Sequence, residues 1–519
     1  MTSISNASSV MNQPRRHGRP WNPLYVSLAA VIATVIAGEL LQFFVYRNHV
    51  RFAGGTDFLL YAGQSEAILR GQPPDIIWKP FGGGAWLAMY RLLFGDNMAG
   101  FAVFNSAALG LLPFFAFGFG ALLRGMRSGL ACAAIVAISP ACATLSVLAE
   151  TPAIFFLALS LVTIALIQKL DRWWLASLVA ALGALFLAAA CLCRPDCAVY
   201  ALAALVLTVR PGRAALARFA GSFAFVAAAG VLVLATSWYN KPFYGRGLPV
   251  RYDSYLRYIL VFDTGKDYRV NPTEPAIQEI RASLLKTGAA AEEDLTGTGF
   301  LGWNRGWWYF RQSLKTTKGS YYEADRIMSQ ASVAVIRNNL AGFTEDAART
   351  FASFMLFRPI PGAYTFAHFE SKPGFQWRRL DFVQADQPEI AAAANRLYQS
   401  IRDAREDRPY NNWSNPYNSR YLRLLTFAPL LIYPAVAWLV WTAAGLARWR
   451  ILAVLASPLL AYGAYATTGF YDYRYLAGHS WALWTIAGMG LAAAAESLVI
   501  RASRRLTAKP VTTGEPSHP

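Results

Sequence analysis

Two carboxylates in short polar interruptions of the chain could accept a proton. Asp57 follows two glycines and a threonine, and Glu150 lies in Leu148-Ala149-Glu150-Thr151-Pro152. A carboxylate in a surrounding of low dielectric becomes more basic and can take a proton from a hydroxyl group. Asp57 could equally cap the helix that follows it, and Glu150 could be an ordinary acid in a first helical turn. The spacing leaves both interpretations open.

Three cations could bind a phosphate. They are Lys79 in Trp78-Lys79-Pro80, Arg194 in Arg194-Pro195-Asp196 and Arg474 in Tyr471-Asp472-Tyr473-Arg474-Tyr475. A guanidinium group suits a phosphate through two parallel hydrogen bonds. Each cation also has a plainer interpretation: Lys79 extends towards lipid phosphate, Arg194 pairs with Asp196 within one turn, and the tyrosines around Arg474 form an aromatic belt. Further candidates for substrate contact are Tyr61, Asp196, Asp472 and Tyr473.

The segments that carry these residues are separated by long apolar runs. Several runs reach the ~20 residues that a helix needs to cross a bilayer. We expect about ten spans, at 24–46, 99–123, 129–148, 151–168, 173–192, 197–209, 217–237, 425–446, 451–469 and 477–499. The sequence therefore predicts an all-α polytopic membrane protein.

Basic residues favour one orientation of these spans. The two terminal tails and the short connections near 124–127, 169–172, 210–218 and 448–450 carry Lys and Arg with almost no acid. Because such segments stay in the cytoplasm, both termini are expected inside. The connections with Asp57, Glu150, Arg194 and Arg474 then share the outer face, as a single site would require.

The orientation also divides the chain. We expect a cytoplasmic tail at 1–23, a membrane core at 24–237 with a first outer loop at 47–98, an outer domain at 238–424, C-terminal spans at 425–500 and a second cytoplasmic tail at 501–519. Helical stretches at 58–70 and 81–94 are too short to span and are expected at the membrane interface. The glycines at 82–84 indicate a kink or a tight backbone approach and argue against a regular start of the second helix.

Composition excludes several classes of protein. An apolar share of 55% and a mean hydropathy of +0.30 are too high for a soluble protein of 519 residues. The net charge of +18 lies in loops and tails, so it is a topology signal and not a nucleic-acid surface. The sequence has no Gly-rich phosphate loop, no His-Glu-x-x-His and no Asp-x-Asp. Metal ligands are therefore not indicated, and a divalent cation is optional.

Taken in order, these motifs resemble the GT-C glycosyltransferase superfamily, in particular bacterial relatives of protein O-mannosyltransferases and lipid A aminoarabinose transferases. The similarity lies in five short segments, over roughly 25–240 and 420–500: 57–62, Lys79-Pro80 with 86–95, Ala149-Glu150-Thr151-Pro152, Cys193-Arg194-Pro195-Asp196 and Arg474-Tyr475-Leu476. The Arg-Pro-Asp turn looks like the family's Thr-Arg-Pro-Glu turn. Most of 238–424 does not align.

The resemblance implies a bacterial inner-membrane enzyme that moves a sugar, with inversion, from a polyprenyl-phosphate carrier to a hydroxyl of an envelope glycan, lipid or protein. Asp57 would take the place of the family's base, and Lys79 and Arg474 would hold the carrier phosphate, with Arg194 as a further candidate. The family often pairs two acids in the first loop, whereas Thr56 precedes Asp57 here. Any second acid must come from elsewhere, and Glu150 is the candidate.

Two other classes have similar hydropathy. A secondary transporter or a flippase for lipid or lipid-linked sugar would show repeats and polar residues at mid-membrane, whereas Glu39 is the one acid expected well inside a span. After the enzyme and the transporter or flippase, the third class is a catalytically silent scaffold for cell-wall enzymes. The position of the charges favours the enzyme over the transporter, and only an activity measurement separates the enzyme from the scaffold.

Overall fold

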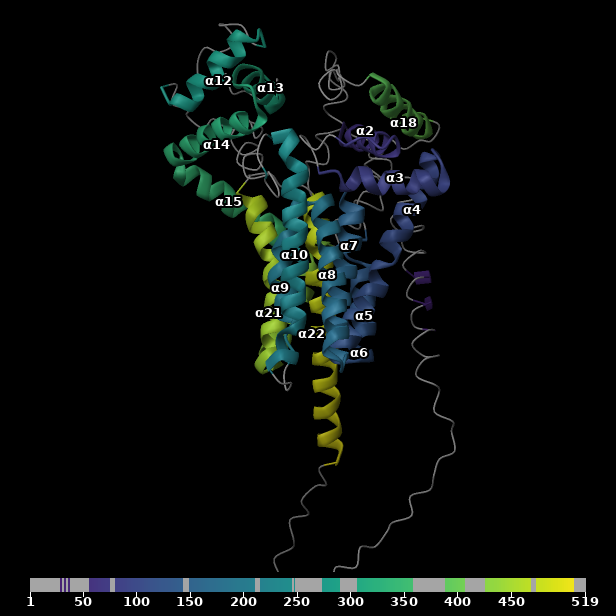
Figure 1. Ribbon diagram of the computed structural model, residues 1–519. Helices are drawn as coiled ribbons and strands as arrows, with labels where there is room; N and C mark the ends of the chain where they lie inside the picture. Colours follow the sequence, from purple (N-terminus) through teal and green to yellow (C-terminus); the bar gives the residue numbers. More distant parts are fainter. Residues whose placement is uncertain are drawn as a thin grey trace, which may run out of the picture.

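The chain is an all-helical, multi-pass membrane protein. The computed structural model describes residues 56–74, 80–142, 149–210, 215–244, 247, 273–289, 306–357, 388–406, 425–467 and 473–507, with a few positions between 29 and 37. Within these ranges every regular element is a helix. In Figure 1 most of the helices stand side by side in an upright bundle, with shorter helices across its upper end.

Six helical segments are long and apolar enough to cross a membrane. They are Met98–Arg124, Glu150–Lys169, Trp173–Cys193, Leu216–Pro242, Gly445–Ala466 and Tyr475–Ser503. Shorter apolar helices cover Met126–Ala137, Pro195–Thr208 and Ala428–Thr442. All nine correspond to expected spans, and the expected first span at 24–46 lies outside the described residues apart from those few positions. Six candidate spans are thus established, and a total of ten is not.

The elements of the bundle follow the chain in order. They are α4 (Met98–Gly110), α5 (Leu112–Arg124), α6 (Met126–Ala137), α7 (Glu150–Leu166) with η3 (Ile167–Lys169), α8 (Trp173–Cys193), η4 (Pro195–Tyr200), α9 (Ala201–Thr208), α10 (Ala215–Tyr244), α20 (Ala428–Thr442), α21 (Gly445–Ala466) and α22 (Tyr473–Thr507). The expected span at 129–148 differs most, because α6 ends at Ala137. Pro140 follows closely, and a proline removes a helical hydrogen bond and disfavours helix in the residue before it.

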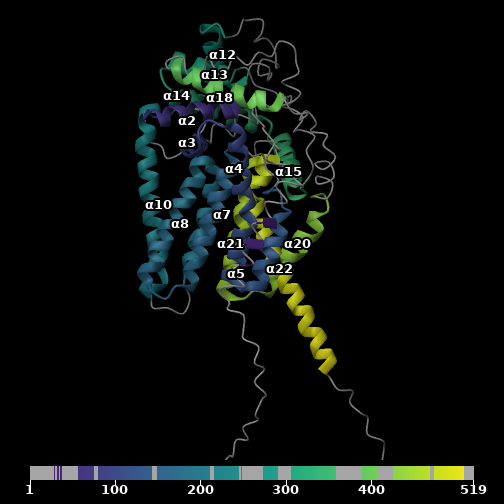
Figure 2. The same cartoon turned by 90° about the vertical axis from the view of Figure 1, so that its right-hand side faces the viewer.

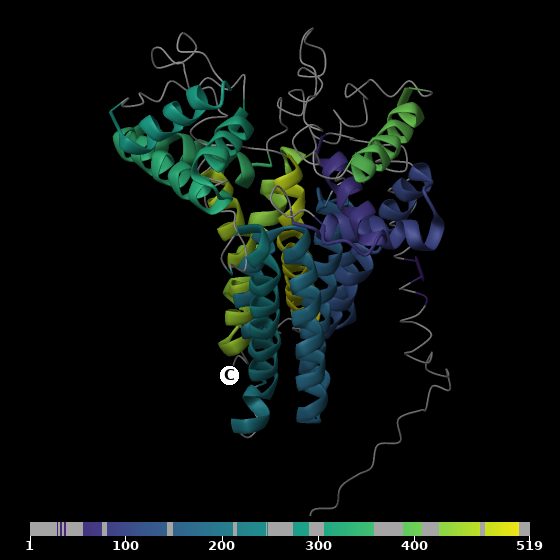
Figure 3. The same ribbon diagram turned by 45° about the horizontal axis from the view of Figure 1, so that its top comes forward.

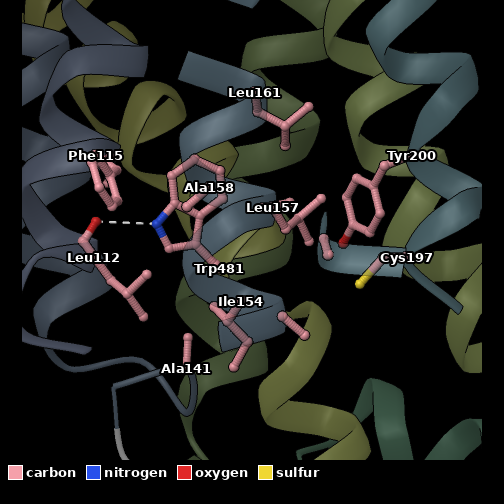
Figure 4. Close-up of a cluster of buried hydrophobic side chains, with 14 of the residues drawn as sticks. Leu112, Phe115, Ala141, Ile154, Leu157, Ala158, Leu161, Cys197, Tyr200 and Trp481 are labelled. Atoms are coloured by element: carbon pink, nitrogen blue, oxygen red, sulfur yellow. Dashed lines mark hydrogen bonds between the residues drawn. The ribbon is translucent and has the colours of Figure 1, made fainter. Parts of the chain in front are cut away.

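Long aliphatic and aromatic side chains fill the centre of the bundle. Trp481 of α22 is fully buried, and its indole Nε1 donates to the Leu112 carbonyl at 3.1 Å. Figure 4 shows this bond beside the α7 residues Ile154, Leu157 and Leu161. The bond satisfies a donor that would be costly to bury unpaired, so α22 is fixed to the start of α5.

Two short helices of the first loop lie across the upper end of the bundle (Figures 1 and 3). They are α2 (Thr56–Leu69) and α3 (Gly82–Phe94). The helix α3 begins regularly at Gly82, so the expectation of an irregular start was wrong, whereas the tight approach is confirmed. A Cβ atom at Gly84 would lie 2.4 Å from the Cβ of Gln64 in α2. Only glycine allows this packing.

The segment between α10 and α20 adds further helices at the same end, four of them together on one side and α18 apart on the other, next to α2 (Figure 1). They are α12 (Pro275–Lys286), α13 (Gly306–Lys318), α14 (Tyr321–Asn338), α15 (Leu340–Met355) and α18 (Pro388–Glu406). In Figure 2, α18 crosses above α2, and Arg70 of α2 donates to Glu389 of α18 at 2.7 Å.

The end of α15 reaches the bundle itself. Phe354 and Phe357 are fully buried. The Phe354 ring stacks on Tyr462 of α21 with a centroid separation of 5.1 Å, and Phe357 packs edge-on against Trp484 of α22 at 5.9 Å. The end of α15 is therefore anchored in the core and does not merely rest on it.

Candidate functional site

Three of the predicted site residues meet at the upper end of the bundle. Arg194, between α8 and η4, donates through Nη1 to Oε1 of Glu150 at 2.6 Å and through Nε to Oδ1 of Asp196 at 3.2 Å. Glu150 is the first residue of α7, and Asp196 lies in the first turn of η4. The interpretation of Arg194 and Asp196 as an internal pair is confirmed, and Glu150 joins that pair from 44 residues away.

Two further polar side chains complete what we call the Arg194 cluster: Glu150, Arg194, Asp196, Tyr465 and His479. The Nε2 atom of His479 lies 2.6 Å from Oδ2 of Asp196. The Tyr465 hydroxyl donates to the same carboxylate and accepts from Arg194. Because the carboxylate of Asp196 accepts hydrogen bonds, its contact with His479 places a ring proton on Nε2 of His479. The cluster thereby joins α7, η4, α21 and α22.

Aromatic rings enclose the cluster. The rings of Tyr465 and Tyr475 stack at 4.2 Å with an interplanar angle of 9°, and the Arg194 guanidinium lies 4.8 Å from the centre of the Tyr475 ring. On the other side, Tyr200 stacks on His479 at 5.8 Å. A guanidinium over a tyrosine face gains electrostatic stabilisation that increases when water is excluded. Tyr475 directly follows Arg474 in α22.

Burial makes the charges of the cluster interdependent. The Glu150 side chain is 8% exposed, that of Arg194 10% and that of Asp196 17%. Burial alone would lower the pKa of Arg194, but the carboxylates of Asp196 and Glu150 raise it well above its ordinary value. Arg194 is therefore a permanent cation. It is held by its neighbours through all three nitrogens.

Two buried polar atoms of the cluster have no hydrogen-bond partner within the described ranges. They are Oε2 of Glu150 and Nδ1 of His479. A carboxylate oxygen is a hydrogen-bond acceptor, and Nδ1 of an imidazole that carries its single proton on Nε2 is one as well. Buried polar atoms are normally paired, so each marks a place where a water molecule or a ligand hydroxyl would be stabilised. The cluster can thus accept protons or hydrogen bonds at two points.

The first-loop helices pack directly against this region. A Cβ atom at Gly82 of α3 would lie 2.5 Å from the backbone of Leu192 and Cys193, immediately before Arg194. One at Gly83 would lie 2.8 Å from the Tyr61 ring and 3.2 Å from Cβ of Ala149, immediately before Glu150. These contacts bring Tyr61 and α2 to the edge of the Arg194 cluster.

The remaining predicted residues are placed only partly. Asp57 lies in the first turn of α2, about one turn before Tyr61, and Tyr473 and Arg474 open α22. The side chains of these three, together with Lys79, Asp472 and Glu39, lie outside the described residues.

Sequence reasoning missed Tyr465 and His479. Each lies in the apolar part of a long helix, and the only available signal was a histidine four residues after Tyr475 on the same helical face. In the described part of the chain no three His, Cys, Asp or Glu side chains are grouped as a metal ion would require. The chemistry that the cluster itself offers is acceptance of protons and positioning of neighbouring groups.

No protein-family model, curated protein or solved structure matches this chain.

Proposed function

We propose that the chain is an inverting membrane glycosyltransferase of GT-C type, which moves a sugar from a polyprenyl-phosphate carrier to a hydroxyl of an envelope glycan, lipid or protein at the outer face of a bacterial inner membrane. One observation carries the proposal: the Arg194 cluster and the first-loop helices α2 and α3 meet at one end of the bundle through Gly82 and Gly83. A lipid-linked donor has its scissile bond at headgroup depth, which is where such a site is needed.

The roles divide between the loop and the cluster. Asp57, in the first turn of α2, is proposed as the base that takes the proton of the acceptor hydroxyl, and Lys79 and Arg474 as the cations that stabilise the leaving phosphate. Glu150 supplies a second acid through its unpaired Oε2. Tyr61, Asp472 and Tyr473 are proposed to contact the substrate. No protein-bound metal is required.

Arg194 receives a different role from the one its sequence position suggested. Its nitrogens already donate to Glu150, Asp196 and Tyr465, so few donors remain for a phosphate. We assign it to positioning: it fixes Glu150 and holds the ring of Tyr475, and Tyr475 adjoins Arg474 at the start of α22.

The test is sugar transfer by the purified protein from a polyprenyl-phosphate sugar. The donor is first identified by mass spectrometry of lipid-linked sugars and envelope glycans after deletion of the gene. Asp57→Asn should lower transfer by at least ~100-fold, the lower limit for loss of a general base. The matched control is Asp96→Asn in the same loop, because Asp96 is 63% exposed and pairs with Arg91 at the surface; it should retain transfer within about twofold.

Full transfer by Asp57→Asn would remove Asp57 as the base. A deletion strain with unchanged glycans and lipid-linked sugars would count against the transferase as a whole. If the deletion instead left a lipid-linked sugar trapped on the inner leaflet, the flippase would be the correct alternative.

A further inference from the structure

A second group of charged residues lies at the opposite end of the bundle, where α9 ends and α8, α10 and α21 begin. Its described cations are Lys169, Arg172, Arg210, Arg218, Arg448 and Arg450. Asp171, which is exposed, is the only acid in the described parts of 167–172, 209–218 and 445–450. This end therefore has a large positive excess.

Two of these arginines are directed into the protein. Arg210 is 3% exposed, and its Nη2 donates to the backbone carbonyls of Leu170 and Asp171, the latter at 3.1 Å. Arg450 is partly buried, and its Nη2 donates to Oε1 of Gln168 at 2.6 Å and to the Val209 carbonyl at 2.5 Å. Arg450 thus contacts the residue directly before Arg210, and the two guanidinium groups belong to one site. We call Arg210 and Arg450 with these carbonyls the basic-end site.

Capping of helix ends explains part of this arrangement. The carbonyls of Val209 and Leu170 follow the last turns of α9 and η3, and a cation at a helix C-terminus is favourable. Carbonyls are neutral, however, and in the described part of the chain Arg450 has no carboxylate partner. Its Nε is buried and has no hydrogen-bond partner there. An anion would supply both the negative charge and the hydrogen-bond acceptor that this desolvated cation lacks.

Two exposed apolar side chains belong to the same segments. Trp449, next to Arg450, is 65% exposed, and Leu216 at the start of α10 is 70% exposed. The first turn of α10 is joined to the site because the Arg210 amide donates to the Arg218 carbonyl at 3.2 Å. A ligand that contacts all of these groups must carry an anion and a hydrocarbon chain.

We propose that the basic-end site binds the headgroup phosphate of an anionic phospholipid. Arg450 and Arg210 hold the phosphate, and the acyl chains lie against Trp449 and Leu216. Basic pockets between spans are a known way to retain such lipids. The site is independent of the proposed transferase chemistry, because no group of the Arg194 cluster takes part in it.

The experiment is native mass spectrometry of the full-length protein with equal amounts of phosphatidylglycerol and phosphatidylcholine. The wild-type protein should retain phosphatidylglycerol in preference. Arg450→Gln should reduce that retention about fivefold, the change expected for one cation at an anionic headgroup. Arg448→Gln is the matched control, because Arg448 has the same charge on the same helix but is exposed and donates to the Ala443 carbonyl at 2.8 Å. It should retain the lipid.

Three results would overturn the proposal: equal retention of the two lipids by the wild-type protein, equal losses in the Arg450 and Arg448 variants, or retention of inorganic phosphate as strong as that of phosphatidylglycerol. The last result would identify a site for a soluble anion. The comparison of lipids on the wild-type protein decides even if Arg450→Gln cannot be purified. Each readout is binding, so failure here leaves the transferase proposal standing, and the reverse also holds.

Discussion

Removal of the cation at the centre of the Arg194 cluster should destabilise the protein strongly. Arg194→Met keeps an unbranched side chain but leaves Glu150, which is 8% exposed, and Asp196, which is 17% exposed, without their shared partner. Breaking a buried ion pair by deleting one partner costs about 3–5 kcal/mol. We expect the lower part of this range, because Asp196 keeps His479 at 2.6 Å.

The free energy of unfolding is measured by denaturant titration in detergent, followed by the fluorescence of the 16 tryptophans. Arg349→Met is the control: Arg349 is 74% exposed and pairs with Glu345 one turn away, so its loss should cost less than ~0.5 kcal/mol. Adding Glu150→Gln to Arg194→Met removes one stranded charge and should restore part of the stability. A single variant within about 1 kcal/mol of wild type, or a double variant less stable than the single one, would refute the reasoning.

Two further predictions concern the first-loop helices. Gly82→Ala should lower the free energy of unfolding by about 1–3 kcal/mol in the same titration, because its Cβ would lie 2.5 Å from the Leu192 backbone. The control Gly230→Ala, in open space on α10, should stay within ~1 kcal/mol of wild type. Equal effects would contradict the close packing. Burial alone would raise the pKa of Glu66, but hydrogen bonds from Arg70 and Arg91 lower it below its ordinary 4.5. Its carboxylate therefore adds stability above pH 4.5 that is lost as pH falls through the lower folded pKa. The stability difference between wild type and Glu66→Gln should shrink as the pH falls below 4.5, and a constant difference would show that the hydrogen bonds do not shift the pKa.

The meeting of Glu150, Arg194 and Asp196 was predictable because it depends on chain direction alone. Successive spans run in opposite directions, so every second turn of the chain lies at the same end of the bundle. This holds whatever the packing between the helices. The opposite turns confirm this: Gln168, Val209 and Arg450 lie within hydrogen-bonding distance at the other end. Which membrane face each end occupies stays a prediction from the positive charges.

Positions along apolar helices could not be predicted in the same way. Tyr465 and His479 join the cluster because of how α21 and α22 rotate against η4, and rotation is fixed by packing between helices far apart in sequence. Hydropathy averages over whole turns, so a single hydroxyl or imidazole is lost in it. The early end of α6 is different, because Pro140 is a local signal that the averaged profile concealed.

At the end of α15, the domain boundary given by hydropathy differs from the one given by packing. By hydropathy Phe354 and Phe357 belong to the polar insertion, and by packing they belong to the membrane bundle, since both are fully buried against α20, α21 and α22. A cut at the hydropathy boundary would carry two phenylalanines into water and leave Tyr462 and Trp484 uncovered. The rings also link α15 to the Arg194 cluster. Phe354 stacks on Tyr462 and its ring centre lies 6.1 Å from that of Tyr465, whose hydroxyl accepts a hydrogen bond from Arg194. A displacement of α15 therefore reaches the charged centre across one ring contact.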